Sequence, residues 1–495
     1  MNGRRSSSAL AFAGALCAAA LAGCAAGPNF VRPEPPAADR YTAQHLQIEA
    51  APGAGDAAQH VELGDPLGPE WWRRFGSDAL DDIVARALVG NRTLAAAAAT
   101  LAQAQELAAA AAGTLAPQVG LTAGIGRQKY GEEFLGSLPK PPPFTYFAVG
   151  PTVSYTLDYT GGEARSVEQR FALADVQRQQ LEAARLAVAG NAVMQSLRIA
   201  SLRAQIATLD AILDQDRENL KLVHMAFDAG SVSRLDIVSA ESQLASDTTL
   251  LPPLRQELSL AEHALAIVLG RPPAGASLPE LDLARLTLPR ELPVSLPSEL
   301  ARRRPDILAA EAQLHAATAA VGVADANLYP HITLSATAGQ QSATLAHLFD
   351  RSSSVWGLAA GLVAPIFDGG TLHAEQRASA EALRASAAIY EQTVLVAFGQ
   401  VADSLQALDH GAEQLQAQSR AQEAARDNLE LTRKSYHEGN VGVLQVLDAE
   451  RLYQQARLGY VRAEAQRYSD TAQLFLALGG SGPATTRLPY DLQRP

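Results

Sequence analysis

The chain has 495 residues, of which 19% are charged, and its formal net charge is -12. This acidic balance argues against a nucleic-acid partner, because phosphate backbones are bound by a surplus of Lys and Arg. The length alone allows several domains. Only two cysteines occur, Cys17 and Cys24. Cys17 lies inside a predicted export signal, so we expect no disulfide within the mature chain.

The first 23 residues have the pattern of a bacterial lipoprotein signal peptide. Two arginines form a basic start, and Ala9 to Ala22 is an apolar run too short to span a bilayer. Leu21-Ala-Gly-Cys24 then resembles a lipoprotein cleavage box. We therefore predict cleavage before Cys24 and its lipidation, palmitate included; a spare thiol in a longer signal is the alternative. Loss of the two arginines leaves a mature charge of -14.

Residues 24–70 are predicted to form a lipidated tether, because they are rich in Pro, Gly and Ala and show no period. Trp71 and Trp72 begin the folded part. No stretch of the mature chain has the ~20 unbroken apolar residues of a transmembrane helix. A role in a membrane must therefore come through strands or lipid.

The folded part contains an internal sequence repeat. Gly230 to Glu241 (GSVSRLDIVSAE) returns 209 residues later as Gly439 to Glu450 (GNVGVLQVLDAE). Leu269-Gly270 returns at the same offset as Leu478-Gly479. A unit of roughly 200 residues is too long for a solenoid repeat. We therefore predict a duplicated module of helices and strands, whose pseudo-symmetry suits a ring.

This duplication divides the chain into a first repeat at 71–297 and a second at 298–480. A Pro-rich linker at 270–297 ends the first repeat, and a C-terminal tail follows at 481–495. Each repeat has the same predicted order: a helix, two strands and a long helical hairpin.

Four short strands are predicted from alternation with a period of two. They cover residues 117–127, 145–159, 331–340 and 355–367. Apolar residues take one face of each strand and small polar residues the other, as in transmembrane barrels. A sheet of four strands cannot close on itself within lipid, so several chains would have to complete it.

Long helices flank the strands. The predicted helices cover 78–112, 163–228, 235–269, 298–327, 371–437 and 444–478. The 163–228 helix would be about 100 Å long, so it must pack laterally on similar helices, other subunits included. Apolar residues at 3,4 spacing near its end form a coiled-coil seam. Asp216 occupies one seam position, and we interpret it as a register-setting or water-facing residue.

These features resemble the TolC-like outer-membrane efflux channels, in their lipoprotein branch of the NodT and OprM type. The segments that carry the resemblance are Arg303 to Leu314 (RRPDILAAEAQL), Leu269 to Pro273 (LGRPP), Pro365 to Gly370 (PIFDGG) and the cleavage box. The resemblance covers residues 24 to about 480.

The resemblance implies a mostly α chain with a small transmembrane β part. A long-helix α-barrel would be continuous with a trimeric 12-stranded β-barrel, to which each chain gives four strands. The homotrimer would be lipid-anchored in the outer membrane and extend into the periplasm. It would export small molecules passively, coupled through a periplasmic adaptor (membrane fusion) protein to an inner-membrane transporter.

Gly230 and Gly439 are predicted to end the two long helices as C-caps. The resemblance makes these turns the periplasmic tip that meets the adaptor. It also makes Asp236, Tyr436 and Asp448 gate candidates. A hydrogen bond from Tyr436 to Asp236 would hold the tip closed, and a ring of Asp448 from three chains would favour cations.

Two positions depart from the family pattern near this tip. Gln445 stands where TolC itself carries a second acid, and Val441 stands where it carries an arginine. A double acidic ring and an arginine link are therefore not expected. The local alternatives are a solvated helix face for Asp448 and Glu450, and a helix-packing aromatic for Tyr436.

The sequence offers no motif for enzymatic chemistry. Its ten histidines are scattered, without an HExxH motif or metal-ligand spacing. It has no P-loop, no dinucleotide fingerprint and no GxSxG elbow. We expect no enzyme, catalytic residue, metal or cofactor.

Two alternatives to an efflux channel stay open. One is the outer-membrane duct of a protein secretion system. The other is a non-conducting lipid-anchored scaffold, which would have no need of amphipathic strands.

Overall fold

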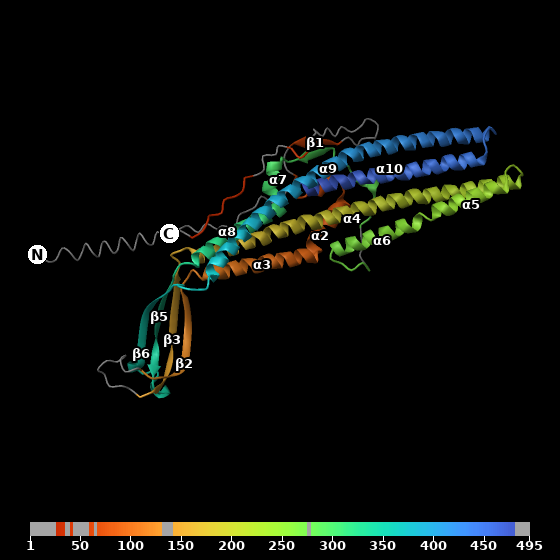
Figure 1. Cartoon of the computed structure of the whole chain (residues 1–495). Coiled ribbons are helices and arrows are strands. Elements are labelled where there is room, and N and C mark those ends of the chain that lie inside the picture. Colours follow the sequence, from red (N-terminus) through yellow and green to blue (C-terminus); the bar gives the residue numbers. More distant parts are fainter. Residues whose placement is uncertain are drawn as a thin grey trace. The chain divides into compact units, whose positions relative to one another are not determined.

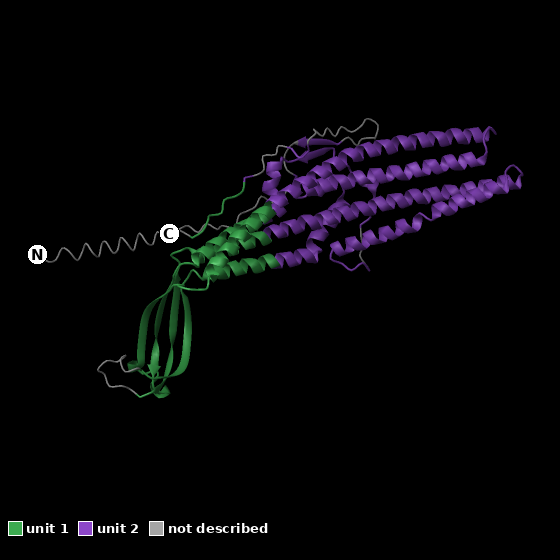
Figure 2. Ribbon diagram, in the orientation of Figure 1, with its two compact units in different colours: residues 1–33, 100–177, 310–390 green, residues 34–99, 178–309, 391–495 purple. Residues whose placement is uncertain are grey.

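The structure is a computed structural model, and it describes residues 26–34, 40–42, 59–63, 67–130, 142–274 and 279–480. The described chain is mostly helical, with a four-stranded and a two-stranded sheet (Figure 1). It divides into two compact units (Figure 2): unit 1 takes residues 1–33, 100–177 and 310–390, and unit 2 takes 34–99, 178–309 and 391–495. The predicted mostly α chain with a small β part is confirmed.

The described elements of the first half begin with a short strand and a 3-10 helix. In chain order they are β1 (His60–Leu63), η1 (Trp71–Phe75), α2 (Asp78–Gly90), α3 (Arg92–Gly113), β2 (Gln118–Gln128), β3 (Phe144–Leu157), α4 (Gly162–Asp228), α5 (Arg234–Thr248) and α6 (Leu251–Val268).

A linker with two short elements, η2 (Leu283–Arg285) and β4 (Glu291–Val294), leads to the second half. The second half contains, in chain order, α7 (Pro297–Arg303), α8 (Pro305–Ala326), β5 (His331–Ser342), η3 (Leu345–His347), η4 (Arg351–Ser353), β6 (Ser354–Val363), α9 (Thr371–His437) and α10 (Val443–Ala477).

Two helices that the sequence predicts as continuous, 78–112 and 298–327, are each divided in two, and the interruption that Pro252-Pro253 predicts in the 235–269 helix is confirmed. Asn91 separates α2 from α3, because its backbone is extended and its Oδ1 caps the next helix by accepting from Thr93 and Leu94 N–H. Arg304 is extended ahead of Pro305, since proline disfavours a helical residue before it. The α5–α6 break lies just before Pro252-Pro253, which the first turn of α6 accommodates.

The four-stranded sheet of unit 1 is antiparallel, in the order β2-β3-β5-β6. Its register aligns the predicted apolar faces, because Val119 lies opposite Val153, Val153 opposite Ala336, and Ala336 opposite Leu358. Directly opposed residues share a face. The residues one position along, among them Gly120, Thr152, Thr337 and Gly357, therefore lie on a second face that is rich in Thr, Ser and Gly.

The apolar face of this sheet is open. Leu121 on β2 is 76% exposed and Trp356 on β6 is 78% exposed. Both β2 and β6 are also edge strands of the sheet within this chain. Exposed apolar side chains and unpaired strand edges are both unfavourable in water, so the sheet by itself is incomplete.

The compact units cut across the two sequence repeats. Strands β3 and β5 come from different repeats and pair directly. Strand pairing therefore gathers the strand segments of both halves into unit 1, while the distal parts of both helical hairpins fall in unit 2. The repeat is a unit of sequence and not a unit of packing.

In unit 2 the distal part of α4 packs through the predicted seam. Leu209 and Leu213 are each 1% exposed. Asp216 is 6% exposed, so the interpretation of a seam residue holds and the water-facing alternative is wrong. The seam buries Asp216 because neighbouring helices cover α4 on that side.

One helix in the described part of the chain, α8, is long and apolar enough to cross a membrane by length and composition. Nearly half of its most apolar window is buried. Its Glu311 and His315 form polar contacts of 2.8 Å with Arg32 and Glu168 within unit 1. A packed core helix meets the same criteria of length and composition, and the contacts of Glu311 and His315 are those of a packed helix.

Candidate channel gate and anchor site

The two long helices end in the same backbone motif. At the first tip Gly230 has a φ of 74°, its N–H donates to Phe227 O, and Ser231 N–H donates to Ala226 O. At the second tip Gly439 has a φ of 80°, and the same two bonds recur with Tyr436 O and Ser435 O as acceptors. This is a Schellman C-cap, which requires a left-handed residue and so favours glycine.

The structure places the gate candidate Asp236 in the first turn of α5. Its Oδ2 accepts from Ser233 N–H at 2.7 Å and from Ser233 Oγ at 2.8 Å, which forms a capping box. The carboxylate therefore stabilises the start of α5. This local role was not part of the sequence prediction, although Ser-x-x-Asp before an apolar run is its signature.

The gate candidate Tyr436 lies in the last turn of α9 and packs against an apolar cluster at the tip. The cluster contains Val223, Ile237, Ala240 and Val443. This placement matches the helix-packing alternative. The hydrogen bonds that the structure gives the Asp236 side chain come from Ser233 and not from Tyr436. The Tyr436–Asp236 bond therefore stays a prediction.

Asp448 and Glu450 lie two residues apart on α10 and have different surroundings. The Asp448 side chain is 62% exposed and pairs with Arg451 of its own helix at 2.7 Å, so a solvated face describes it. Glu450 is 3% exposed, so the solvated-face interpretation is wrong for this residue. The two residues lie on different sides of α10, and only the packing of neighbouring helices decides which side is buried.

Glu450 joins three helices. Its Oε2 accepts from Asn219 Nδ2 of α4, and its Oε1 accepts from Arg433 of α9 at 2.9 Å. Burial nevertheless raises the pKa of Glu450, although Arg433 and Asn219 both act to lower it. Sequence reasoning missed this contact, because Glu450 repeats Glu241 and the repeat gives no sign that only one of the two is buried.

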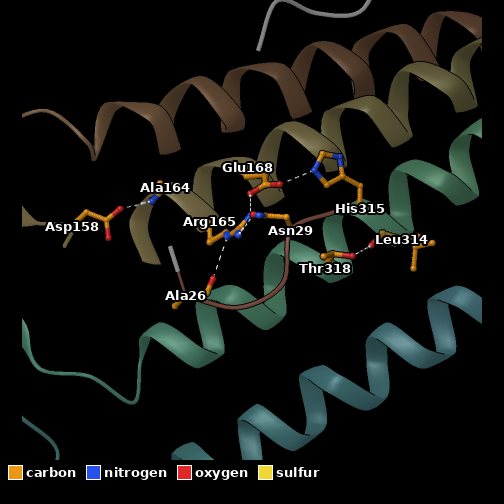
Figure 3. A network of polar contacts seen from close by, with 9 residues as sticks. All are labelled: Ala26, Asn29, Asp158, Ala164, Arg165, Glu168, Leu314, His315 and Thr318. Carbon is orange, nitrogen blue, oxygen red and sulfur yellow. Dashed lines mark hydrogen bonds and ion pairs between the residues drawn. The ribbon is translucent and has the colours of Figure 1, made fainter. Parts of the chain in front are cut away.

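The chain just after the predicted lipidation site is held by side chains of unit 1 (Figure 3). Ala26 N–H donates to Thr160 O at 2.8 Å, in the segment between β3 and α4. Arg165, which is 6% exposed, donates to Ala26 O at 3.3 Å and to Asn29 Oδ1 at 2.6 Å. Cys24 itself lies outside the described residues.

Arg165 is in turn fixed by an acid that bridges α4 and α8 (Figure 3). Glu168 accepts from Arg165 at 2.7 Å and contacts His315 Nε2 at 2.8 Å. The hydrogen bond with His315, followed by that with Arg165, lowers the pKa of Glu168 against the effect of burial. The Phe30 ring stacks on His315 with centroids 4.4 Å apart. The sequence analysis did not single out any of these residues.

Comparison with known proteins places these features in one family. The model of the outer membrane efflux protein family matches residues 83–271 and 296–480. The pyoverdine export outer membrane protein OpmQ of Pseudomonas aeruginosa is 33% identical over 418 residues, 83% of this chain and 87% of that protein. Nodulation protein T of Rhizobium leguminosarum bv. trifolii is 27% identical over 473 residues, 93% and 95% of the two chains.

The fold of the chain is also that of solved channels. The structure of the outer-membrane channel OprN aligns with a TM-score of 0.81 at 27% identity, and the alignment covers 92% of this chain and 99% of that one. The chain therefore belongs to the outer membrane efflux protein family, and it is an outer-membrane efflux channel with the TolC-like fold.

Proposed function

We propose that three copies of this chain form the outer-membrane duct of a tripartite efflux system, and that the duct exports small molecules. The open sheet carries this proposal. Strands β2 and β6 run antiparallel to each other, so β6 of one copy can pair with β2 of the next without reversing the alternation. Three copies then give twelve antiparallel strands with every edge paired.

The two faces of the sheet suit this closure. The face that contains Val119, Leu121 and Trp356 turns to lipid, and the face of Thr, Ser and Gly turns to a water-filled lumen. Closure removes the edge strands, and lipid covers the apolar side chains that water leaves exposed.

The pump and the adaptor are further parts of the proposal. The tip turns at Gly230 and Gly439 would meet a periplasmic adaptor, and an inner-membrane transporter would supply the energy. The name of the relative OpmQ, a pyoverdine export protein, supports an export role for this chain. Transport through the duct itself would need no catalytic residue of this chain.

Conductance tests the duct directly. The purified protein, reconstituted into planar bilayers, is expected to give discrete channel currents. A chain that binds vesicles without conducting would support the scaffold alternative. Restored drug resistance in a strain that lacks its own outer-membrane duct supports small-molecule export, whereas restored secretion of a protein substrate alone would support the secretion alternative.

Lipidation of Cys24 also belongs to the proposal. The contacts that Ala26 makes at the β3–α4 junction place the following chain beside the ends of the strands, which is where an anchor in the same membrane would be needed. Multiple acyl chains give stable anchoring. Metabolic labelling with palmitate should label the wild type and leave the Cys24→Ser variant unlabelled; equal labelling of both would reject Cys24 as the acceptor.

The gate is proposed for Asp236, Tyr436 and Asp448. A Tyr436–Asp236 hydrogen bond would require Asp236 to leave its capping contact with Ser233. Replacing Tyr436 by Phe should then raise single-channel conductance, and unchanged conductance would count against the bond. A ring of Asp448 should favour cations. Asp448→Ala should lower the cation-to-anion permeability ratio, and an unaffected ratio would discard the ring.

A further inference from the structure

Asp216 is a buried carboxyl group with an unmet hydrogen bond. It lies on α4, is 6% exposed, and its Oδ2 has no hydrogen-bond partner among the described residues. A carboxylate oxygen can only accept hydrogen bonds, and leaving it buried without a donor is costly. A proton on this carboxyl would convert the oxygen from an orphan acceptor into a donor.

The acceptor for such a proton is present on the neighbouring helix. The carboxyl of Asp247 lies within hydrogen-bond reach of Asp216. Asp247 stands in the last turn of α5, which contains no basic residue, and the helix ends one residue later. Its Oδ2 accepts from Gln243 at 2.7 Å. A negative charge at a helix C-terminus is unfavourable, and a second negative charge nearby adds repulsion between the two carboxylates.

The surrounding charges compensate the two acids only in part, through Arg217. Glu450 of α10 faces Asp216 as a third acid, and it already engages Arg433 of α9. Arg217 of α4 pairs with Asp214 at 2.6 Å on an exposed surface. Among the described residues, no group of three or more His, Cys, Asp or Glu side chains could hold a metal ion.

We propose that Asp216 holds a proton and donates it in a hydrogen bond to the carboxyl of Asp247, and that this bond joins the end of α5 to α4. Loss of the proton leaves two facing carboxylates, which repel each other and release the last turn of α5 at the α5–α6 break. The pair is thus a proton-binding site that loosens the first hairpin as the pH rises.

The pKa of Asp216 agrees with the geometry. Burial, followed by the charge of Asp247, raises it from 3.8 to about 7. In the state in which α5 is joined to α4, the pKa of this carboxyl is raised. The carboxyl stabilises that state fully below its ordinary pKa, and this stabilisation is lost as the pH rises through the raised value. Release should therefore increase from about pH 4 to about pH 7 and then level off.

The second hairpin is a built-in control. At the repeat offset of 209 residues, Asp216 corresponds to Ala425 and Asp247 to Ala456. The two hairpins thus share a register, and the carboxyl pair is present in only the first. A pH effect that arises from the pair must be confined to the first hairpin.

Hydrogen exchange of the full-length protein in detergent tests the proposal. After correction for intrinsic exchange rates, protection of residues 244–250 should fall about tenfold or more between about pH 5 and about pH 7, and then level off. Protection of the counterpart, residues 453–459, should stay constant. Protection of 244–250 that does not change with pH, or that changes equally in both hairpins, would overturn the proposal.

Isosteric variants separate the Asp216–Asp247 hydrogen bond from a lone buried acid. Asp216→Asn and Asp247→Asn should each abolish the pH dependence, because one amide can donate to the remaining carboxylate at any pH. Glu241→Gln removes an exposed acid from the same helix and should keep the wild-type profile. Persistent pH dependence in either Asn variant, or its loss in Glu241→Gln, refutes the pair. If one variant does not fold, the other and the wild-type comparison still decide.

Discussion

The two helical hairpins turn through the same backbone motif at their tips and have different polar interiors. Both tips use a Schellman turn at a glycine, and both bury the following alanine, Ala240 and Ala449, at 3% exposure. The next residue is Glu in both repeats, yet Glu241 is exposed and Glu450 is 3% exposed. Duplication thus preserved the turn and the apolar contacts, while buried charge became specific to each hairpin.

The return helices differ as well. The first returns as α5 and α6, with a break before Pro252-Pro253, whereas the second returns as the single helix α10. Proline cannot donate a helical hydrogen bond, so the first hairpin must interrupt its ladder there. The break and the carboxyl pair of Asp216 and Asp247 occur in the same hairpin, which gives the first hairpin a weak point that the second lacks.

The largest expected difference in stability between the hairpins lies at the glycines that follow their return helices, Gly270 after α6 and Gly479 after α10. A Cβ on Gly270 would lie 2.1 Å from Gly90 O, whereas one on Gly479 meets its nearest atom, Arg304 Cγ, at 3.3 Å. Gly270→Ala should therefore destabilise the protein by about 3 kcal/mol, and Gly479→Ala by about 1 kcal/mol. Thermal unfolding in detergent, followed by circular dichroism, measures both. Equal losses would show that the close approach to Gly90 relaxes freely.

A smaller difference is expected at the repeated glutamates. Glu450→Ala removes the acceptor of Asn219 and Arg433 and should cost about 2 kcal/mol. Glu241→Ala is the matched control, since this side chain is exposed, and it should change stability by less than about 0.5 kcal/mol. The same unfolding measurement applies. A loss in the control as large as in Glu450→Ala would remove the contrast between the hairpins.

The carboxyl pair can be transplanted. The double substitution Ala425→Asp and Ala456→Asp places two acids at the matching positions of the second hairpin. Protection of residues 453–459 should then weaken as the pH rises, by at most about 1.4 kcal/mol per pH unit below the raised pKa. The double Asn variant supplies similar volume without titration and should show no pH dependence. A double Asp variant that behaves like the Asn variant would mean that the hairpins differ in more than these residues.

The smallest effect is expected at the tips. Apart from the adjacent residues, no atom in the described part of the chain lies within 4 Å of a Cβ built on Gly230 or Gly439, so alanine meets only the cost of a positive φ. Each substitution should destabilise by about 1 kcal/mol, and the two losses should agree. Hydrogen exchange of the adjacent helical turns reports the local change. Unequal losses would indicate that one tip bears on another part of the assembly.

Much of the fold follows from local patterns. The period-two stretches became β2, β3, β5 and β6, and the proline-free stretches became α4 and α9 with ends within one residue of the expected bounds. Local patterns were weaker at the breaks. The division between α2 and α3 depends on the Asn91 cap, which a helix-favouring composition on both sides conceals.

The candidate site shows a different balance. The glycines of the tips could be predicted, because a left-handed residue at a helix end has a recognisable sequence signature. The partners of Asp236 and Tyr436 could not be assigned from the resemblance, since the side chain of Asp236 is held by a local cap and the ring of Tyr436 by an apolar cluster. The N-terminal contacts of Arg165 join residues more than a hundred positions apart, a distance that no local pattern reports.

The sequence by itself determined the duplicated order of helices and strands, the apolar face of every strand and the glycines that turn the chain at each tip. These depend on periodicity and backbone preference, which act over a few residues. Only the tertiary structure decided that β3 pairs with β5, that Glu450 is buried while Glu241 is exposed, and that Asp216 faces Asp247. Burial and charge pairing depend on which surfaces meet across the fold, and chemically identical residues in two repeats can meet different neighbours.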